Sequence, residues 1–365
     1  MIVFAADLHM TPLVWVDQPE MRGDAYASFV QIVTYCLEHK ASALILGGDI
    51  FNKTRPDSES VKLFEEGVAL LAAEGVLVYF IQGQHDRAEP PWASSLTTLA
   101  QYIGDGKTAA IDIDDIPAVV CGYDCMPGHQ LHATLEADKE AGKAYNILLI
   151  HQLARSFIPF EGAWDFDMEW VSECVELVLA GDYHAPVNKG KLWYSGSTHA
   201  RNVTEFSQRS FITVGRHEDG TFDVQRVPLQ VRTVIEVVII VEDQLKTAIE
   251  ALTKYMPSTD DMPGIIAKPL VFARYNADIP LALSQLEDVC HEHGFILRTR
   301  AMAGGTEVVA QVALPQGAVT LESCLAQVVN REEDEEFHSF VLALLKAEEP
   351  RDVLVATRAQ LGVAT

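Results

Sequence analysis

Basic residues are scarce in this chain of 365 residues, which has 27 lysines and arginines against 52 aspartates and glutamates. The formal net charge at pH 7 is therefore −25. Proteins that bind nucleic acid unaided usually carry a basic surface, because phosphate contacts dominate their affinity. The composition argues against such a stand-alone protein. Either the substrate is not a polyanion, or metal ions and a basic partner supply the attraction.

Long apolar runs and paired cysteines are also missing. No uninterrupted run of about 18 apolar residues occurs, so we expect no membrane span. Residues 1–7 lack the basic region of a secretory signal. None of the six cysteines belongs to a C-x-x-C pair. We therefore expect reduced cysteines in the core of a cytoplasmic protein.

Short clusters of histidine and carboxylate residues are present instead, each after an apolar, strand-like run. They are Asp7-Leu8-His9, Gly47-Gly48-Asp49, Gly83-Gln84-His85-Asp86, His151-Gln152 and Gly181-Asp182-Tyr183-His184. One such cluster is a weak signal, because an isolated histidine is usually a core or surface residue. Five clusters in order, all in the same strand-end position, are a strong signal.

Strand-like and helix-like segments alternate at the start of the chain. We predict strands at 2–6, 43–46 and 76–81, with helices at 25–39 and 57–75 between them. This alternation indicates an α/β architecture, in which functional groups gather at the carboxyl ends of strands. A second sheet is predicted from strands at 118–121, 147–150, 175–180, 191–197 and 210–214.

The pattern changes near Pro228. A β-α-β-α-β series follows, with strands at 234–241, 269–275 and 295–300 and helices at 243–255 and 280–293. From Thr320 the sequence shows two apolar helical stripes without an obvious core of their own, and such segments dock on their own chain or on a partner. We therefore predict three parts, at residues 1–228, 229–315 and 316–365.

The residue types in the clusters suit hydrolysis of a phosphoester by two metal ions. Two ions about 3.5–4 Å apart can activate a water molecule and stabilise charge on the phosphorus oxygens. Asp49, on its glycine turn, is the natural candidate for the bridging carboxylate. Imidazole, carboxylate and amide ligands without thiolates suit manganese, iron or zinc. Next to Gln84, His85 could remain free of metal and either form a hydrogen bond with a phosphate oxygen or protonate the leaving group.

The order of these motifs resembles the calcineurin-like metallophosphoesterases. The segments Leu46–Asn52, Ile150-His151-Gln152 and Trp193–Thr198, followed by Glu205-Phe206, narrow the resemblance to the SbcD-type nuclease subunit of the SbcCD exonuclease. The resemblance covers most of the chain and is firmest over residues 1–225. It implies a four-layer sandwich of two mixed sheets flanked by helices, a small α/β capping domain and a helical C-terminal tail.

The resemblance also implies a ligand set for two divalent ions, with manganese favoured and magnesium as the alternative. The first ion would take Asp7, His9 and His184 and share Asp49. The second ion would take Asp49, Gln84, His151 and Asp182. His85 would be the catalytic histidine that binds no metal. Gln84 and Asp182 depart from the family's asparagine and histidine, and both departures fall on the second ion.

The implied function is that of a DNA exonuclease and endonuclease subunit in repair and recombination. It would work with an SbcC-like ATPase that has a coiled coil, and it would form a homodimer through helices near 57–74 and 92–103. Two alternatives stay open. The acidity slightly favours a small-molecule or nucleotide phosphoesterase, and a second metal site weakened at Gln84 and Asp182 would leave a non-catalytic scaffold.

Overall fold

The computed structural model describes residues 1–14, 21–92, 98–158, 160, 162–202, 205, 208–255, 268–277 and 283–302. Contacts divide the chain into two compact units, and the described residues among 1–154 and 165–302 belong to the first. The predicted segment 316–365 lies outside the described residues, as do residues 303–315 of the predicted capping domain. The three predicted domain boundaries stay a prediction.

The first sheet has six strands in the order β12-β11-β1-β2-β3-β4. Their bounds are β1 Ile2–Ala5, β2 Ala43–Gly47, β3 Leu77–Ile81, β4 Ala100–Tyr102, β11 Ser210–Arg216 and β12 Phe222–Pro228. β1 to β4 are parallel, whereas β11 runs antiparallel to β1 and to β12. The sheet is therefore mixed, with an antiparallel edge.

The second sheet also has six strands, in the order β5-β6-β7-β8-β10-β9. Their bounds are β5 Lys107–Ile113, β6 Ile116–Tyr123, β7 Ile147–His151, β8 Leu177–Gly181, β9 Val187–Lys189 and β10 Leu192–Tyr194. The neighbours β6, β7, β8 and β10 are parallel, and the two edge strands are antiparallel to their neighbours. A short 3-10 helix, Met168–Trp170, precedes β8.

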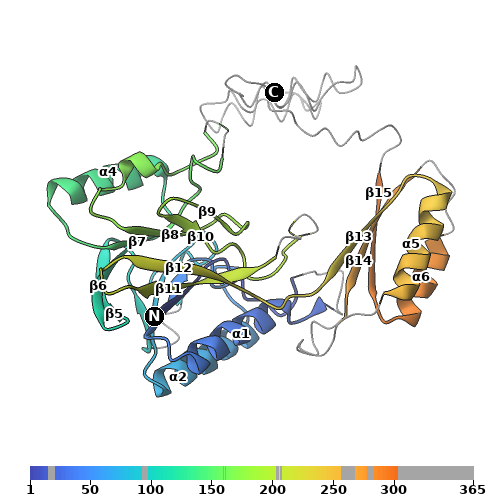
Figure 1. Cartoon of the computed structure of the whole chain (residues 1–365), viewed down its shortest axis with the longest axis horizontal. Coiled ribbons are helices and arrows are strands. Elements are labelled where there is room, and N and C mark those ends of the chain that lie inside the picture. The colour runs from blue at the N-terminus through green and yellow to red at the C-terminus, as the bar shows by residue number, and fades with distance from the viewer. Residues whose placement is uncertain are drawn as a thin grey trace, which may run out of the picture. The chain divides into compact units, whose positions relative to one another are not determined.

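Two layers of core follow from the alternation of side chains along the strands. From β1, Val3 packs with Phe29 of helix α1 (Asp24–Glu38) and Phe64 of helix α2 (Ser58–Ala73). Phe4 points the other way and packs with Leu149 of the second sheet. Helix α4 (Gly128–Glu140) lies beyond the second sheet (Figure 1). This arrangement confirms the predicted four-layer sandwich.

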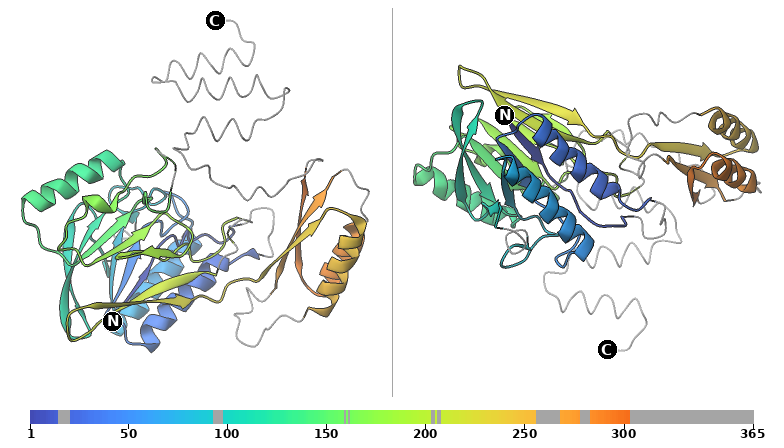
Figure 2. Two further views of the ribbon diagram at one scale, coloured as in Figure 1. Left: turned by 45° about the horizontal axis from the view of Figure 1, so that its top comes forward. Right: turned by 90° about the horizontal axis from the view of Figure 1, so that it is seen from below.

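A third sheet contains the parallel strands β13 (Val234–Ile239), β14 (Leu270–Asn276) and β15 (Ile296–Met302). Helices α5 (Glu242–Lys254) and α6 (Leu283–Glu292) pack on one face of it (Figure 2). The predicted β-α-β-α-β series is therefore confirmed. Parallel strands need crossover connections, and the two helices provide them.

Several elements differ from the sequence-based expectation. The expected helix near 92–103 is wrong at residues 100–102, which form β4 beside β3. Three residues are too few to show strand periodicity, so this strand left no signal. Helix α4 was missed because only Leu131 and Leu135 of its side chains are buried, which leaves a weak apolar stripe. Strands β5, β9 and β12 were also missed.

Within the described ranges, no helix is long and apolar enough to cross a membrane. The cysteines at 36, 121, 125, 174 and 290 are free thiols. Cys324 lies outside the described residues.

Candidate metal centre

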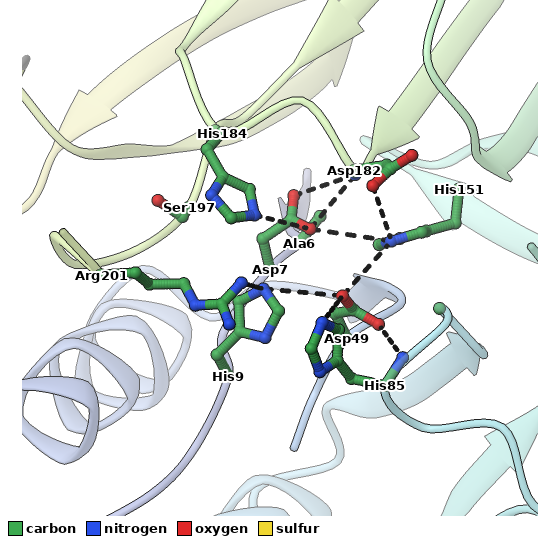
Figure 3. Close-up of polar contacts among 12 residues, drawn as sticks. Ala6, Asp7, His9, Asp49, His85, His151, Asp182, His184, Ser197 and Arg201 are labelled. Carbon is green, nitrogen blue, oxygen red and sulfur yellow. Dashed lines mark hydrogen bonds and ion pairs between the residues drawn. The ribbon is translucent and has the colours of Figure 1, made fainter. Parts of the chain in front are cut away.

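The predicted polar clusters meet at the carboxyl ends of strands from both large sheets (Figure 3). Asp7 and His9 follow β1, Asp49 follows β2, His85 follows β3, His151 ends β7, and Asp182 and His184 follow β8. In open α/β sheets, functional groups collect outside these strand ends. The pairing of β1 with β2 and of β7 with β8 brings the clusters together.

Tight turns after the strands aim the carboxylates into the centre. Asp7, Asp49 and Asp182 all have left-handed backbones, with φ values of 54°, 51° and 84°. Aspartate tolerates this region better than most residues. The amide of Asp7 donates to the carbonyl of Gly48 at 3.1 Å, and the amide of His9 donates to the carbonyl of Asp49 at 2.8 Å. These bonds join the two turns, so their side chains reach the same space.

Gly48 is required by the close approach of its neighbours. Its φ is 93°, and a Cβ atom there would lie 2.5 Å from Nδ1 of His151 and 2.7 Å from the amide nitrogen of Gly83. Both distances are well below van der Waals contact. Only glycine lets the turn after β2 pass this close to β7.

Asp49 lies at the middle of the cluster. Its Oδ2 is 3.5 Å from Nε2 of His9, 3.7 Å from Nε2 of His151 and 3.9 Å from Nε2 of His85. Asp7 Oδ1 is 3.7 Å from Nε2 of His151 and 4.0 Å from Nε2 of His184. The two carboxylates therefore lie among four imidazole rings, and Asp49 has the position that a bridging ligand needs.

Among the residues that the structure describes, three groups of side chains could each hold a cation, with ligand atoms within 4.8 Å of one another. They are Asp7, His9 and His184; Asp7, Asp49 and His151; and His9, Asp49 and His85. The first group contains the three side chains that the family resemblance implies for the first ion besides Asp49. The second group shares Asp49 and His151 with the set implied for the second ion, but it includes Asp7, which the resemblance assigns to the first ion. The third includes His85, so the geometry alone does not separate His85 from the ligands.

The two positions that depart from the family pattern contact each other. Nε2 of Gln84 donates to Oδ1 of Asp182 at 2.6 Å, and this carboxylate oxygen is 4.0 Å from Nε2 of His151. Gln84 is exposed and Asp182 is half-buried, whereas Asp7, Asp49 and His151 are buried. The pair lies on the solvent side of the centre, next to the predicted second ion.

Buried atoms without partners test whether a cation fits. Asp49 Oδ2 and His151 Nε2 are both buried and make no hydrogen bond. Leaving such groups unpaired is costly in a folded protein. Nδ1 of His151 lies 2.6 Å from the carbonyl oxygen of Gly47, which can only accept, so Nδ1 carries the hydrogen and Nε2 faces the carboxylates. Oxygen and imidazole ligands in this arrangement fit divalent cations.

The electrostatics of the centre also favour a cation. Burial raises the pKa of Asp7 to about 6, against the opposing charges of His151 and His184. Burial disfavours charge on His151, but the attraction of the nearby carboxylates of Asp49, Asp7 and Asp182 outweighs burial and raises its pKa to about 10. Burial and the charge of Arg201 hold the pKa of His9 well below its usual value. Without ions, the centre therefore retains protons that bound cations would displace.

Four further residues at the centre were not predicted to act there. Asp86 accepts from the amides of Ile50 and Phe51 at 2.8 and 2.9 Å, which holds the chain after Asp49. Nη1 of Arg201 is 2.9 Å from Nε2 of His9. Glu205 and Arg209 surround His184.

The sequence carried a signal for two of these residues. Asp86 closes the Gly83-Gln84-His85-Asp86 motif, and Glu205 lies in a segment that carried the family resemblance. Arg201 and Arg209 belong to no motif, and 192 positions separate Arg201 from His9. His199 is also buried near Arg201, and its pKa is lowered to about 3, first by burial and then by the charge of Arg201.

The sequence of this chain is similar to those of known DNA repair proteins. The DNA double-strand break repair protein Mre11 of Methanosarcina acetivorans is 22% identical over 343 residues, which cover 88% of this chain and 54% of the relative. The Mre11 protein of Methanocaldococcus jannaschii is 24% identical over 308 residues, covering 79% of this chain and 80% of the relative. The chain thus spans about half the length of the first of these relatives.

A crystal structure of TT1561 of Thermus thermophilus is also similar, with a TM-score of 0.37 and 12% identity. The match covers 62% of this chain and 97% of the TT1561 chain. The family model of the calcineurin-like phosphoesterases matches residues 1–215, which include the whole second sheet, the first sheet except β12 and the end of β11, and every residue of the centre described above. The chain therefore belongs to the calcineurin-like phosphoesterase family.

Proposed function

We propose that this chain is a metal-dependent DNA phosphodiesterase, an exonuclease and endonuclease subunit that works with an SbcC-like ATPase. Membership of the phosphoesterase family supports the reaction class, and relatives named as DNA double-strand break repair proteins support the substrate. One observation carries the proposal: buried carboxylates and imidazoles from five strand ends converge around unpartnered atoms.

Seven side chains would hold two divalent ions, with manganese favoured and magnesium as the alternative. The first ion would be held by Asp7, His9, His184 and Asp49. The second ion would be held by Asp49, Gln84, His151 and Asp182. When bound, such ions supply an activated water and neutralise charge on the phosphorus oxygens. Asp182 adds an oxygen ligand with a negative charge, which favours hard ions at the second position.

His85 is proposed to protonate the leaving oxygen. Its Nδ1 lies 3.0 Å from the carbonyl oxygen of Asn52, and because a carbonyl only accepts, Nδ1 carries a hydrogen. Nε2 then faces the carboxylate of Asp49 (Figure 3). The side chain is 35% exposed, so a substrate can reach it. A protonated Nε2 can donate to the departing oxygen, which is the role of a general acid.

The acidity of the chain supports dependence on a partner. A net charge of −25 repels a polyanion over most of the surface. Of the basic residues that the structure describes near the centre, Lys53 and Arg55 lie exposed just after Asp49, Arg201 reaches His9, and Arg209 is buried. An ATPase with a basic channel would supply the missing attraction. We also propose a homodimer, on the family resemblance alone.

The test uses linear duplex DNA with the full chain, manganese and the cognate ATPase. We expect cleavage by the wild type, and loss of both cleavage and manganese binding in Asp49→Ala. The matched control is Asp219→Ala, which removes an exposed aspartate from the turn between β11 and β12. Cleavage that survives in Asp49→Ala at the wild-type rate would rule the centre out.

The same preparation separates the two alternatives. Hydrolysis of a small phosphodiester such as bis(4-nitrophenyl) phosphate, without DNA cleavage under any partner condition, would favour a small-molecule phosphoesterase, which the acidity of the chain also favours. Less than one manganese ion per chain and no hydrolysis would indicate a scaffold.

A further inference from the structure

We infer that Glu205 is a positioning residue that fixes the ring of His184 for metal binding. The inference rests on the proposed function, in which His184 is a ligand of the first ion. Glu205 lies between β10 and β11, away from the five polar clusters in the sequence. Its carboxylate reaches His184 from the side opposite the metal cluster.

The contact determines which nitrogen of His184 is available. Oε1 of Glu205 is 2.9 Å from Nδ1 of His184, and an ionised carboxylate can only accept. Nδ1 therefore carries the hydrogen, and Nε2 is the nitrogen that faces Asp7, whose Oδ1 is 4.0 Å away. A carboxylate behind a metal-binding histidine selects the tautomer, orients the ring and raises its basicity.

Glu205 is itself held firmly by its surroundings. Oε1 also accepts from Nδ2 of Asn202 at 2.8 Å, and Oε2 accepts from the amide of Arg201 at 3.0 Å and from Oγ of Ser197 at 3.3 Å. The side chain is only 13% exposed. Several donors on a mostly buried carboxylate leave it little freedom to rotate. Because the ring of His184 is hydrogen-bonded to this carboxylate, its orientation is fixed as well.

Arg209 contacts the backbone of both His184 and Glu205. Its buried guanidinium donates to the carbonyl of His184 at 2.7 Å and to Oγ of Ser197 at 3.0 Å, and it also donates to the carbonyl of Glu205. Nη2 of Arg209 is 3.8 Å from Oε2 of Glu205. The buried Nε of Arg209 makes no hydrogen bond with a described residue, so the two terminal nitrogens of the guanidinium make all of these contacts. Glu205 and Arg209 thus hold His184 at both its ring and its backbone.

This support acts on one side of the centre. The amide contact with Glu205 also anchors Arg201, whose guanidinium lies against His9, another proposed ligand of the first ion. At the proposed second ion, His151 is held by the carbonyl of Gly47, and Gln84 and Asp182 hold each other. Loss of Glu205 should therefore weaken the first ion and leave the second in place.

The experiment measures manganese binding to the full-length protein by isothermal titration calorimetry. In Glu205→Ala we expect one of two sites to weaken about 10–100-fold, the usual effect of removing such a partner. Glu205→Gln retains one acceptor oxygen, so we expect a smaller loss at the same site. The matched control is Glu176→Ala. Glu176 lies at the amino end of β8, where its carboxylate accepts a hydrogen bond from Asn146, and its removal lowers the negative charge of the chain by the same amount as Glu205→Ala.

Each result decides the inference. A loss confined to one site supports it, and wild-type affinities at both sites in either Glu205 variant overturn it. If Glu205→Ala does not fold by circular dichroism, Glu205→Gln alone decides. Failure of the proposed function is seen separately, because the wild-type protein would then bind fewer than two manganese ions before any variant is measured, and the inference would fall with it.

Discussion

At the scale of single residues, Asp49 shows how environment selects a charge state. Burial alone would raise its pKa, but the nearby imidazole of His151 and the amide and ring of His85 outweigh burial and lower it. Its Oδ1 accepts from the amide of His85 at 2.8 Å, while its Oδ2 has no hydrogen-bond partner. The carboxylate therefore stays ionised with one oxygen anchored and the other open to a cation, as a bridging ligand requires.

The role of His85 gives the first prediction. In His85→Ala we expect DNA cleavage with manganese and the cognate ATPase to fall by about 10²–10⁴-fold, because a general acid contributes about that much. We expect manganese content, measured by mass spectrometry, to stay near that of the wild type. Loss of one ion would instead identify His85 as a ligand, and normal cleavage would contradict the assignment.

The raised pKa of Asp7 gives a pH prediction. The folded chain holds this proton up to about pH 6, whereas the unfolded chain releases it near the ordinary pKa of 3.8. Between these values the folded metal-free protein therefore loses stability as pH rises. A bound cation replaces the proton, so we expect manganese to raise the melting temperature more at about pH 7.5 than at about pH 5. Scans with manganese and with EDTA measure this, and equal shifts at both pH values would refute it.

At the scale of elements, the turn after β2 gives the third prediction. In Gly48→Ala the new methyl group would collide with His151 and with the backbone of Gly83, at a φ of 93°. We expect a loss of about 1–3 kcal/mol in the free energy of unfolding, as strained backbone positions cost, together with weaker manganese binding. Gly142→Ala is the matched control, because its φ is also positive but its Cβ would meet no atom within 4 Å. Equal effects at both glycines would show that backbone strain alone is responsible.

Helix α2 gives a prediction that separates stability from function. Asp57 caps this helix by accepting from the amide of Ser60 at 2.8 Å. We expect Asp57→Ala to lower the free energy of unfolding by about 0.5–2 kcal/mol in urea, the usual cost of losing a cap. The helix lies on the outer face of the first sheet, so manganese stoichiometry should not change. A change in stoichiometry would mean that this helix supports the centre.

At the scale of the whole molecule, the net negative charge and residues 316–365 give predictions about the proposed ATPase partner. We expect the chain alone to bind duplex DNA weakly and the complex with the ATPase to bind it tightly, because phosphate contacts need basic residues. We further expect removal of residues 316–365 to abolish capture of the ATPase in a pull-down, while metal content stays unchanged. ATPase capture by the shortened chain at the full-length level would remove the partner proposal.

The sequence by itself determined most strands and helices and the positions of the polar clusters. Strands buried on both faces appear as continuous apolar runs, so β1, β2, β3 and β7 could be found directly, and each ended at its polar cluster. The β-α-β-α-β series at 234–300 could also be predicted, because the spacing of its apolar residues changes from that of a strand to that of a helix and back. Local pattern was sufficient for these features.

Only the tertiary structure decided what surrounds the ligands. The contacts of Glu205 with His184 and of Arg201 with His9 join residues 21 and 192 positions apart, and nothing in local periodicity connects them. The edge strand β4 and the polar helix α4 were likewise decided by packing, since neither carries a strong apolar pattern. Side-chain hydrogen bonds between distant segments depend on how the sheets meet, and that is settled only when the whole chain folds.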